Sequence, residues 1–279
     1  MNVKIFSNYT LNKKSYFLIS KIISPVISGA IYNNIPSLLD GDDTENHISD
    51  KYYLYGEFTA LYWIWKNIDI SHYGFCMADT YFIFNNNYKN NISKSFFNKK
   101  NVIKYELNND NKINSLCLKH DIILSKPVHI NNFNSVKDYY NSFIPKNIFN
   151  NFLLMLENNN FLFLRELNKY LNSKYYLGLK CFIFEKTIFN EMCQLIFNVA
   201  DIFEKEYSQI LEDNKYPKLM FYICDIIYGS YIYHLKNSGV YKEIITMNFQ
   251  ESRIHISLQE RLKIYIKNCC NMFNKKTNR

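Results

Sequence analysis

The chain has 279 residues, 48% of them hydrophobic and 17% aromatic, which excludes disorder over its whole length and permits a substantial core. Seven Gly and five Pro exclude collagen-like, linker-dominated and turn-dense all-β chains. The formal charge of +8 permits an anionic partner, but a solvated lysine-rich surface also accounts for it. Because the basic residues are dispersed, we expect no nucleic-acid partner.

The cysteines and the apolar segments indicate the setting of the protein. The seven cysteines are odd in number and irregularly spaced, so we expect reduced, mostly buried thiols and a cytoplasmic protein. The first residues, MNVKIFSNYT, lack the apolar stretch of a signal peptide. The segment 219–235 is apolar but contains Asp225, which favours a buried or membrane-surface helix. Peripheral association with the inner membrane therefore stays open.

In chain order, the first half alternates short apolar runs with helical patterns. Residues 3–6 and 25–31 predict buried strands, and the polar segment 40–51 predicts a loop. Residues 52–67 are apolar on nearly every face, which is typical of a fully buried helix. The run 72–84 predicts a strand interrupted by Asp79, and we expect 85–114 to be a polar surface excursion.

The second half continues the alternation. Residues 121–128 predict a strand, and helical spacing over 135–212 is broken by a strand-like run at 175–184. Residues 218–236 and 257–273 predict two further helices. The pattern indicates an α/β fold: one Rossmann-type domain over 1–273, with a mostly parallel central sheet, a helical C-terminal part and a disordered basic tail at 274–279.

Ligands bind such sheets at the carboxyl ends of the strands, so we expect functional residues in the segments 7–10, 40–51 and 79–81. The segment 40–50 is acidic, and its oxygen atoms suit Mg²⁺, Mn²⁺ or sugar hydroxyl groups. The alternative is that Ser49 or Asp50 caps the following helix. The candidate residues of this segment are Asp42, Asp43, Asn46 and Ser49.

Two further carboxylates interrupt apolar segments. Glu57 lies among aromatic residues, where desolvation raises the pKa of a carboxyl group. A carboxylate with a raised pKa is suited to act as a general base near neutral pH. Pairing of Glu57 with Lys66 or with a backbone amide is the alternative. Asp79 emerges from an apolar strand, which is costly unless it faces a cleft at the strand end. There it can hold a divalent cation, or act as a strand-terminal cap.

Charged residues near the C-terminus form a last candidate group. Glu260 and Arg261 are adjacent in a predicted helix, so their side chains point about 100° apart and do not pair. Arg261 suits a leaving phosphate and Glu260 suits a base or a ribose ligand, whereas ordinary surface charge is the alternative. The sequence contains no G-x-S-x-G, P-loop or G-x-G-x-x-G motif, which disfavours a serine hydrolase, a kinase or a nicotinamide-dependent dehydrogenase.

Three groups of segments, in the same order along the chain, resemble a bacterial protein family. They are DDTENHISDKYYLYGEFTALYWIWKN (42–67) with YGFCMADTYF (73–82), DIILSKPV (121–128) with SVKDYY (135–140), and CFIFEKTIFNEMCQLIF (181–197) with RIHISLQERLKIYI (253–266). The family comes from capsular and O-antigen polysaccharide loci, was long described as a domain of unknown function, and includes galactofuranosyltransferases.

The resemblance implies a GT-A-like fold and a glycosyltransferase. Such an enzyme would move a sugar, furanoses included, from a UDP-sugar to a capsular polysaccharide or lipooligosaccharide acceptor. The expected catalytic residues are Glu57, Glu260 and Asp79. The expected donor-binding residues are Asp42, Asp43, Asn46, Ser49, Lys66 and Arg261.

The chain departs from the family at one strand. Where the family has His-Tyr-Arg-Arg, this sequence has Met77, Ala78, Asp79 and Thr80, so two arginines are absent and a carboxylate is present. The change indicates that Mn²⁺ or Mg²⁺ held by Asp79 restores the positive charge, or that the donor differs. The alternative function is a catalytically inactive binding or scaffold subunit of a polysaccharide assembly complex.

Overall fold

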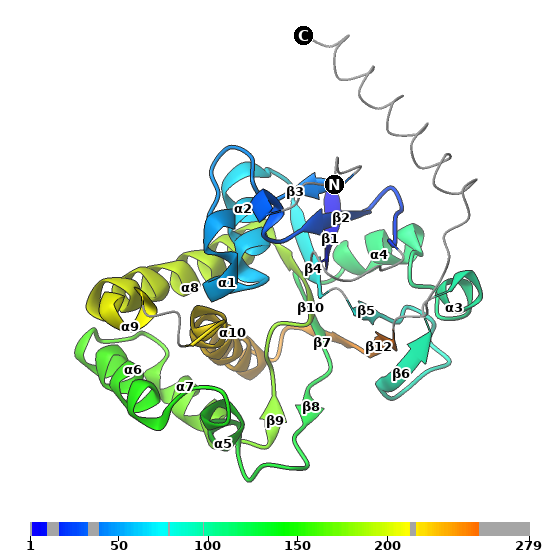
Figure 1. Ribbon diagram of the computed structural model, residues 1–279. Coiled ribbons are helices and arrows are strands. Elements are labelled where there is room, and N and C mark those ends of the chain that lie inside the picture. The colour runs from blue at the N-terminus through cyan, green and yellow to red at the C-terminus, as the bar shows by residue number, and fades with distance from the viewer. Residues whose placement is uncertain are drawn as a thin grey trace.

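A computed structural model (Figure 1) describes residues 2–9, 17–32, 39–77, 79–96, 98–212 and 216–250. The predicted helix over 257–273 and the predicted tail at 274–279 lie outside the described residues, as do Glu260 and Arg261. The proposed single domain over 1–273 therefore extends beyond them and stays a prediction.

A seven-stranded sheet forms the centre of the molecule. Its order is β11 (Lys242–Ile244), β7 (Ile122–Ser125), β10 (Cys181–Glu185), β4 (His72–Cys76), β1 (Val3–Tyr9), β2 (Ile23–Ile27) and β3 (Asp40–Gly41). Only β10 runs antiparallel to its neighbours in this sheet. The α/β class and the mostly parallel sheet are confirmed. Because β10 is reversed, its first residues lie at the edge where the other strands end.

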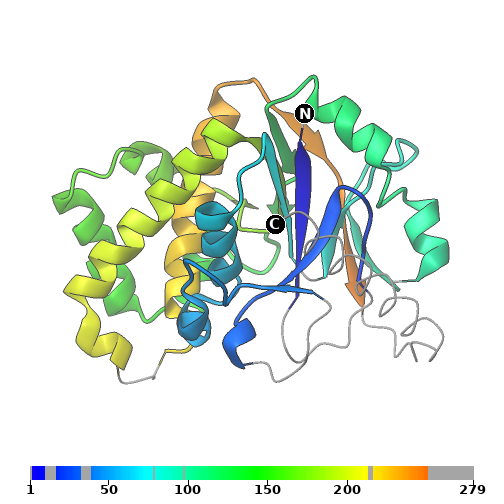
Figure 2. The ribbon, with the colours of Figure 1, turned by 90° about the horizontal axis from the view of Figure 1, so that it is seen from above.

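Helices cover both faces of this sheet, as Figure 2 shows in a nearly edge-on view. The larger layer includes α2 (Phe58–Asn67), α8 (Lys186–Glu206) and α10 (Leu219–Asn237), and α3 (Lys99–Lys104) and α4 (Asp110–Cys117) lie on the other face. Side chains alternate between these layers, so Phe75 and Phe182 belong to one buried cluster and Cys76 and Cys181 to the other.

The remaining elements are short or peripheral. A three-stranded sheet joins β5 (Thr80–Phe82), β12 (Thr246–Gln250) and β6 (Ile92–Phe96), and a two-stranded ribbon joins β8 (Val128–His129) and β9 (Tyr175–Tyr176). The other helices are η1 (Ala30–Tyr32), η2 (Ser49–Lys51), α1 (Tyr52–Tyr55), α5 (Val136–Asn141), α6 (Lys146–Asn158), α7 (Leu164–Leu171) and α9 (Ser208–Glu212).

The structure adds detail to one sequence-based prediction and corrects another. The segment 85–114, expected to be a polar surface excursion, contains β6, α3 and the start of α4. Asn98 and Asn109 cap these helices by accepting hydrogen bonds from the backbone N–H of Asn101 and Lys112. The helix expected over 52–67 is broken into α1 and α2 by Gly56, whose φ is +54°. The break places Glu57 immediately before α2.

Substituting Gly56→Ala is expected to lower the free energy of unfolding by about 1–2 kcal/mol, measured by urea denaturation. The positive φ disfavours any side chain, and the added Cβ would lie 3.1 Å from Cδ2 of Phe221. Gly239→Ala is the matched control, because Gly239 also has a positive φ but no atom within 4 Å of the added Cβ. Equal losses for the two variants would contradict a packing contribution at Gly56.

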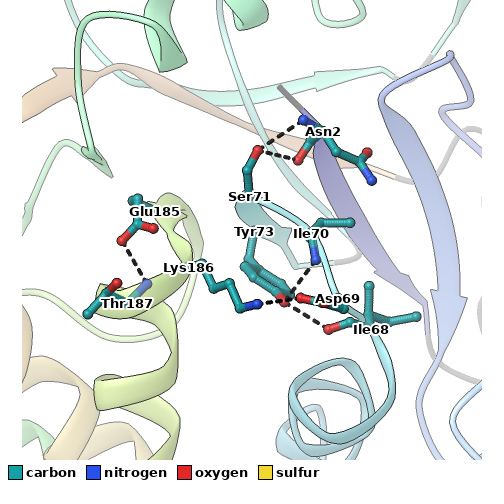
Figure 3. A network of polar contacts seen from close by, with 9 residues as sticks. All are labelled: Asn2, Ile68, Asp69, Ile70, Ser71, Tyr73, Glu185, Lys186 and Thr187. Atoms are coloured by element: carbon teal, nitrogen blue, oxygen red, sulfur yellow. Dashed lines mark hydrogen bonds and ion pairs between the residues drawn. The ribbon is translucent and has the colours of Figure 1, made fainter.

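A polar network at the amino edge of the central sheet fixes the start of β1 and β4 (Figure 3). The backbone N–H of Asn2 donates to Oγ of Ser71 at 2.9 Å, and this hydroxyl donates to the carbonyl of Asn2 at 2.8 Å. Lys186, which follows β10, binds Asp69 at 2.6 Å, just before β4. The network joins the starts of β1 and β4 to the end of β10, at the edge opposite the carboxyl ends of the parallel strands.

The described cysteines are buried and free, as the sequence predicted. They are Cys76, Cys117, Cys181, Cys193 and Cys224. Burial raises the pKa of the Cys117 thiol to about 12. These thiols therefore act as small apolar core residues.

The apolar helix α10 was the candidate for contact with a membrane. Its residues Ile223, Ile226 and Ile227 are all fully buried in the core of the protein. Across the described ranges, no helix combines the length and the apolar character needed to traverse a bilayer.

Candidate functional site

Asp79 lies at the carboxyl edge of the central sheet. It comes three residues after β4 ends at Cys76, in the turn that leads to Thr80 and the smaller sheet. The residue is exposed, and its carboxylate accepts a hydrogen bond from the Thr80 hydroxyl at 3.0 Å. Since β4, β1, β2 and β3 are parallel neighbours, Asp79 shares an edge with the loop that follows β3, and the strands β4 and β3 lie about 15 Å apart across three strand spacings.

Asp42 begins that loop and organises the chain around it. Its side chain is fully buried and accepts hydrogen bonds from the backbone N–H of Gly29 at 3.0 Å and of Ala30 at 2.9 Å. The hydroxyl of Ser49 donates to the same carboxylate at 2.5 Å. Neither Ser49 nor Asp50 caps α1, so the capping alternative is wrong. The structure brings Asp42 and Ser49 together, each in contact with the other.

Substituting Ser49→Ala is expected to lower the free energy of unfolding by about 2 kcal/mol, because a hydrogen bond to a buried carboxylate is lost. Urea denaturation measures the loss, and calorimetry with UDP measures donor affinity. If Ser49 only positions the loop, UDP affinity stays within about twofold. Asp43→Ala, at an exposed neighbouring position, is the stability control and is expected to change stability by under about 0.5 kcal/mol.

The structure places the other donor-binding candidates of the first half on the Asp42 loop and on α2. Asp43 is exposed beside Gly41. Asn46 is exposed too, and its side-chain oxygen accepts a hydrogen bond from the Tyr62 hydroxyl at 3.1 Å. Lys66 lies with its ammonium 3.4 Å from the centre of the Trp65 ring, near the end of α2. Because α2 leads the chain back to the first residue of β4, Lys66 lies towards the amino edge.

Glu57 lies at the opposite end of α2, on the carboxyl side of the sheet. It is 7% exposed, and Oε2 lies 3.7 Å from Nζ of Lys218, at the start of α10. Lys218, and not Lys66, is therefore its ion-pair partner. Within the described ranges Oε2 has no hydrogen-bond partner. A buried carboxylate oxygen without a donor keeps a lone pair free to accept a proton.

The ends of β1 and β2 add buried polar groups to this edge. The hydroxyl of Ser28 donates to Oδ1 of Asn8 at 2.6 Å, and both residues are fully buried. Nδ2 of Asn8 has no partner within the part of the chain that the structure describes. The Tyr9 and Tyr81 hydroxyl groups lie 2.5 Å apart, and burial raises the pKa of both.

Two residues at this edge were not predicted from the sequence. Lys180 immediately precedes β10, and Asp225 lies on α10, where sequence reasoning noted it only as a charge in an apolar segment. The backbone carbonyl of Lys180 accepts a hydrogen bond from the N–H of Met77 at 2.8 Å. Lys180 lies at the end of β4 because β10 runs antiparallel to β4, and no local sequence pattern predicts that direction.

The donor set at Asp79 is small for a metal site. Among the described residues, no three His, Cys, Asp or Glu side chains lie close enough together to hold a metal ion. One carboxylate does fit Mg²⁺ or Mn²⁺ that takes its other ligands from a diphosphate and from water. The described side chains here therefore fit a cation that a substrate carries.

Comparisons with known proteins agree on the fold. The solved structure described as "WbbM bifunctional glycosytransferase apo structure" superposes with a TM-score of 0.77 at 20% sequence identity, covering 92% of this chain and 48% of that chain. This chain thus spans about half the length of that protein. No curated protein sequence matches the chain. The fold is GT-A-like, as the family resemblance implied. Residues 8–238 match the model of the family described as a domain of unknown function (DUF4422), and the chain belongs to that family.

Proposed function

We propose that the chain is a nucleotide-sugar-dependent glycosyltransferase that moves a sugar, furanoses included, from a UDP-sugar to a capsular polysaccharide or a lipid-linked glycan. The observation that carries the proposal is the exposed Asp79 at the end of β4, on the same edge as the Asp42 loop. The fold shared with a solved glycosyltransferase supports it. The buried, free cysteines support a cytoplasmic location, with peripheral contact at the inner membrane left open.

The proposed reaction has a defined flow of bonds and protons. An acceptor hydroxyl oxygen attacks the anomeric carbon, and the bond from that carbon to the diphosphate oxygen breaks, leaving its electron pair on the diphosphate. We assign to Glu57 the removal of the proton from the acceptor hydroxyl, because its buried Oε2 has no hydrogen-bond donor among the described residues. Bound with the donor at Asp79, Mn²⁺ or Mg²⁺ would supply positive charge to the leaving diphosphate.

Thermal shift of the wild-type chain with a panel of nucleotide sugars, with and without Mn²⁺, tests the proposal. A ligand that binds the folded state raises the melting temperature, by an amount that grows with its concentration over the Kd. We expect UDP-sugars to raise the melting temperature. We also expect UDP to be released when an acceptor glycan is added to the chain and a UDP-sugar. A chain that binds no nucleotide sugar would instead be the inactive binding or scaffold subunit.

A further inference from the structure

Lys180 occupies a defined place at the edge that carries Asp79. Cys181 pairs with Cys76, the last residue of β4, so Lys180 lies opposite Met77, where the chain leaves the sheet. Residues alternate along β10, which puts Lys180 on the same face as Phe182. That face is covered by α10, whose Tyr228 contacts the Phe182 ring.

Within the described ranges, the ammonium of Lys180 has no ion-pair partner. The residue is half-buried, and its nearest aromatic contact is the ring of Tyr176, 5.7 Å from Nζ. No hydrogen bond or ion pair joins this ammonium to another of the residues that the structure describes. Burial lowers the pKa of Lys180, although the carboxylates of Asp79 and Asp225 raise it. A half-buried ammonium without a described partner is stabilised when an anion binds beside it.

Asp225 fixes the backbone that carries Lys180. Its carboxylate accepts hydrogen bonds from the N–H of Leu179 at 2.6 Å, the Tyr176 hydroxyl at 2.7 Å and the Tyr140 hydroxyl at 2.8 Å. A Cβ on Gly178 would lie 2.6 Å from Oδ2 of Asp225, so the segment before Lys180 is pressed against α10. A side chain on such a fixed segment loses little freedom on binding.

The end of β4 supplies no positive charge itself. Residues 77–80 contain one acidic side chain and no basic one. Lys180 is a cation that the reversed strand places beside this turn, where the side chains of residues 77–80 by themselves would offer a diphosphate only negative charge. One lysine donates up to three hydrogen bonds to phosphate oxygens.

We propose that Lys180 binds the diphosphate of the donor directly, next to Asp79, and that Asp225 is a positioning residue for it. This inference rests on the proposed function and deepens it, because it assigns the charge that stabilises the leaving diphosphate to a side chain of this protein. It predicts that UDP and inorganic pyrophosphate bind without any divalent cation.

Calorimetry of the full chain with UDP and with pyrophosphate, in EDTA and separately in Mn²⁺, tests the role of Lys180. In EDTA, Lys180→Met is expected to weaken the binding of both ligands at least about 10-fold, and Lys180→Arg is expected to retain affinity within a few-fold. Lys174→Met, at an exposed position in the same segment, is the matched control and is expected to bind as wild type does.

The melting temperature separates binding from folding. Because a desolvated ammonium is replaced by an apolar side chain of similar length, Lys180→Met is expected to melt no lower than wild type. Unchanged affinity in Lys180→Met, with wild type binding UDP, would overturn the role of Lys180 alone. Binding by wild type only in Mn²⁺ would overturn it too. Failure of wild type to bind UDP in both buffers would overturn the proposed function itself.

Discussion

Substituting Asp79→Asn is expected to lower the rate of UDP release from a donor sugar by about 100-fold or more. The asparagine keeps the size and the hydrogen bond from Thr80 but removes the negative charge at the end of β4. In the proposed function Asp79 is the protein ligand of a cation carried by the diphosphate, so the Mn²⁺-dependent part of the rate is expected to disappear. The measurement is UDP release over time, at saturating donor, with and without Mn²⁺.

Asp69→Asn is the matched control for this substitution. Asp69 precedes the same strand, β4, but lies at the amino edge, where it is exposed and pairs with Lys186. An exposed ion pair contributes little to stability, and we expect the variant to react at the wild-type rate. Turnover by Asp79→Asn equal to that of wild type, at every Mn²⁺ concentration, would remove Asp79 from the site.

Substituting Asp225→Ala is expected to lower the free energy of unfolding by about 3–5 kcal/mol. The change leaves the Leu179 N–H and the hydroxyl groups of Tyr140 and Tyr176 without their acceptor, in a site that is 1% exposed. Urea denaturation followed by circular dichroism measures the loss. Tyr176→Phe, which removes one of the three donors, is the graded control and is expected to cost about 1 kcal/mol. A loss under 1 kcal/mol for Asp225→Ala would show that the network does not hold the fold together.

The pH dependence of stability also reports on Asp225. Burial raises the pKa of this carboxyl above its ordinary 3.8, although the three hydrogen bonds to it act in the opposite direction. The folded state therefore binds the proton more tightly than the unfolded state. As pH rises from 3.8 through the raised pKa, the contribution of Asp225 to the free energy of unfolding falls. Relative to Asp225→Asn, wild type is expected to lose stability over this window, and a constant difference would contradict the raised pKa.

Local sequence patterns located the central strands because each strand is a short apolar run buried on both faces. The runs 3–6, 25–31 and 175–184 correspond to β1, β2 and the pair β9 and β10, and 218–236 corresponds to α10. The same patterns missed β11 and β12, which carry polar residues such as Lys242 and Asn248. Edge and peripheral strands bury less apolar surface, so hydrophobic periodicity says little about them.

The candidate site was located in part. The rule that ligands meet the carboxyl ends of parallel strands led to Asp79 and to the Asp42 loop, and both lie at that edge. The roles of the individual side chains did not follow from that rule. Asp42 and Ser49 face each other, Glu57 faces Lys218 instead of Lys66, and Lys66 lies along the ring of Trp65. These contacts depend on how the backbone folds, whether the partners are seven residues apart, as Asp42 and Ser49 are, or far apart, as Glu57 and Lys218 are, so the composition of a loop does not reveal them.

The amino-acid sequence by itself determined the α/β class, the mostly parallel sheet and the position of a carboxylate after β4. These features follow from apolar runs and from the polar residues that interrupt them. Only the tertiary structure decided the reversal of β10, the break at Gly56 and the placement of Lys180 beside the end of β4 and of Asp225 against Leu179. Strand direction depends on contacts between residues far apart in the chain, such as Cys76 and Cys181, and the hydrogen-bond partners of Asp225 lie 46 to 85 positions away from it. Such contacts have no counterpart in the local spacing of residues.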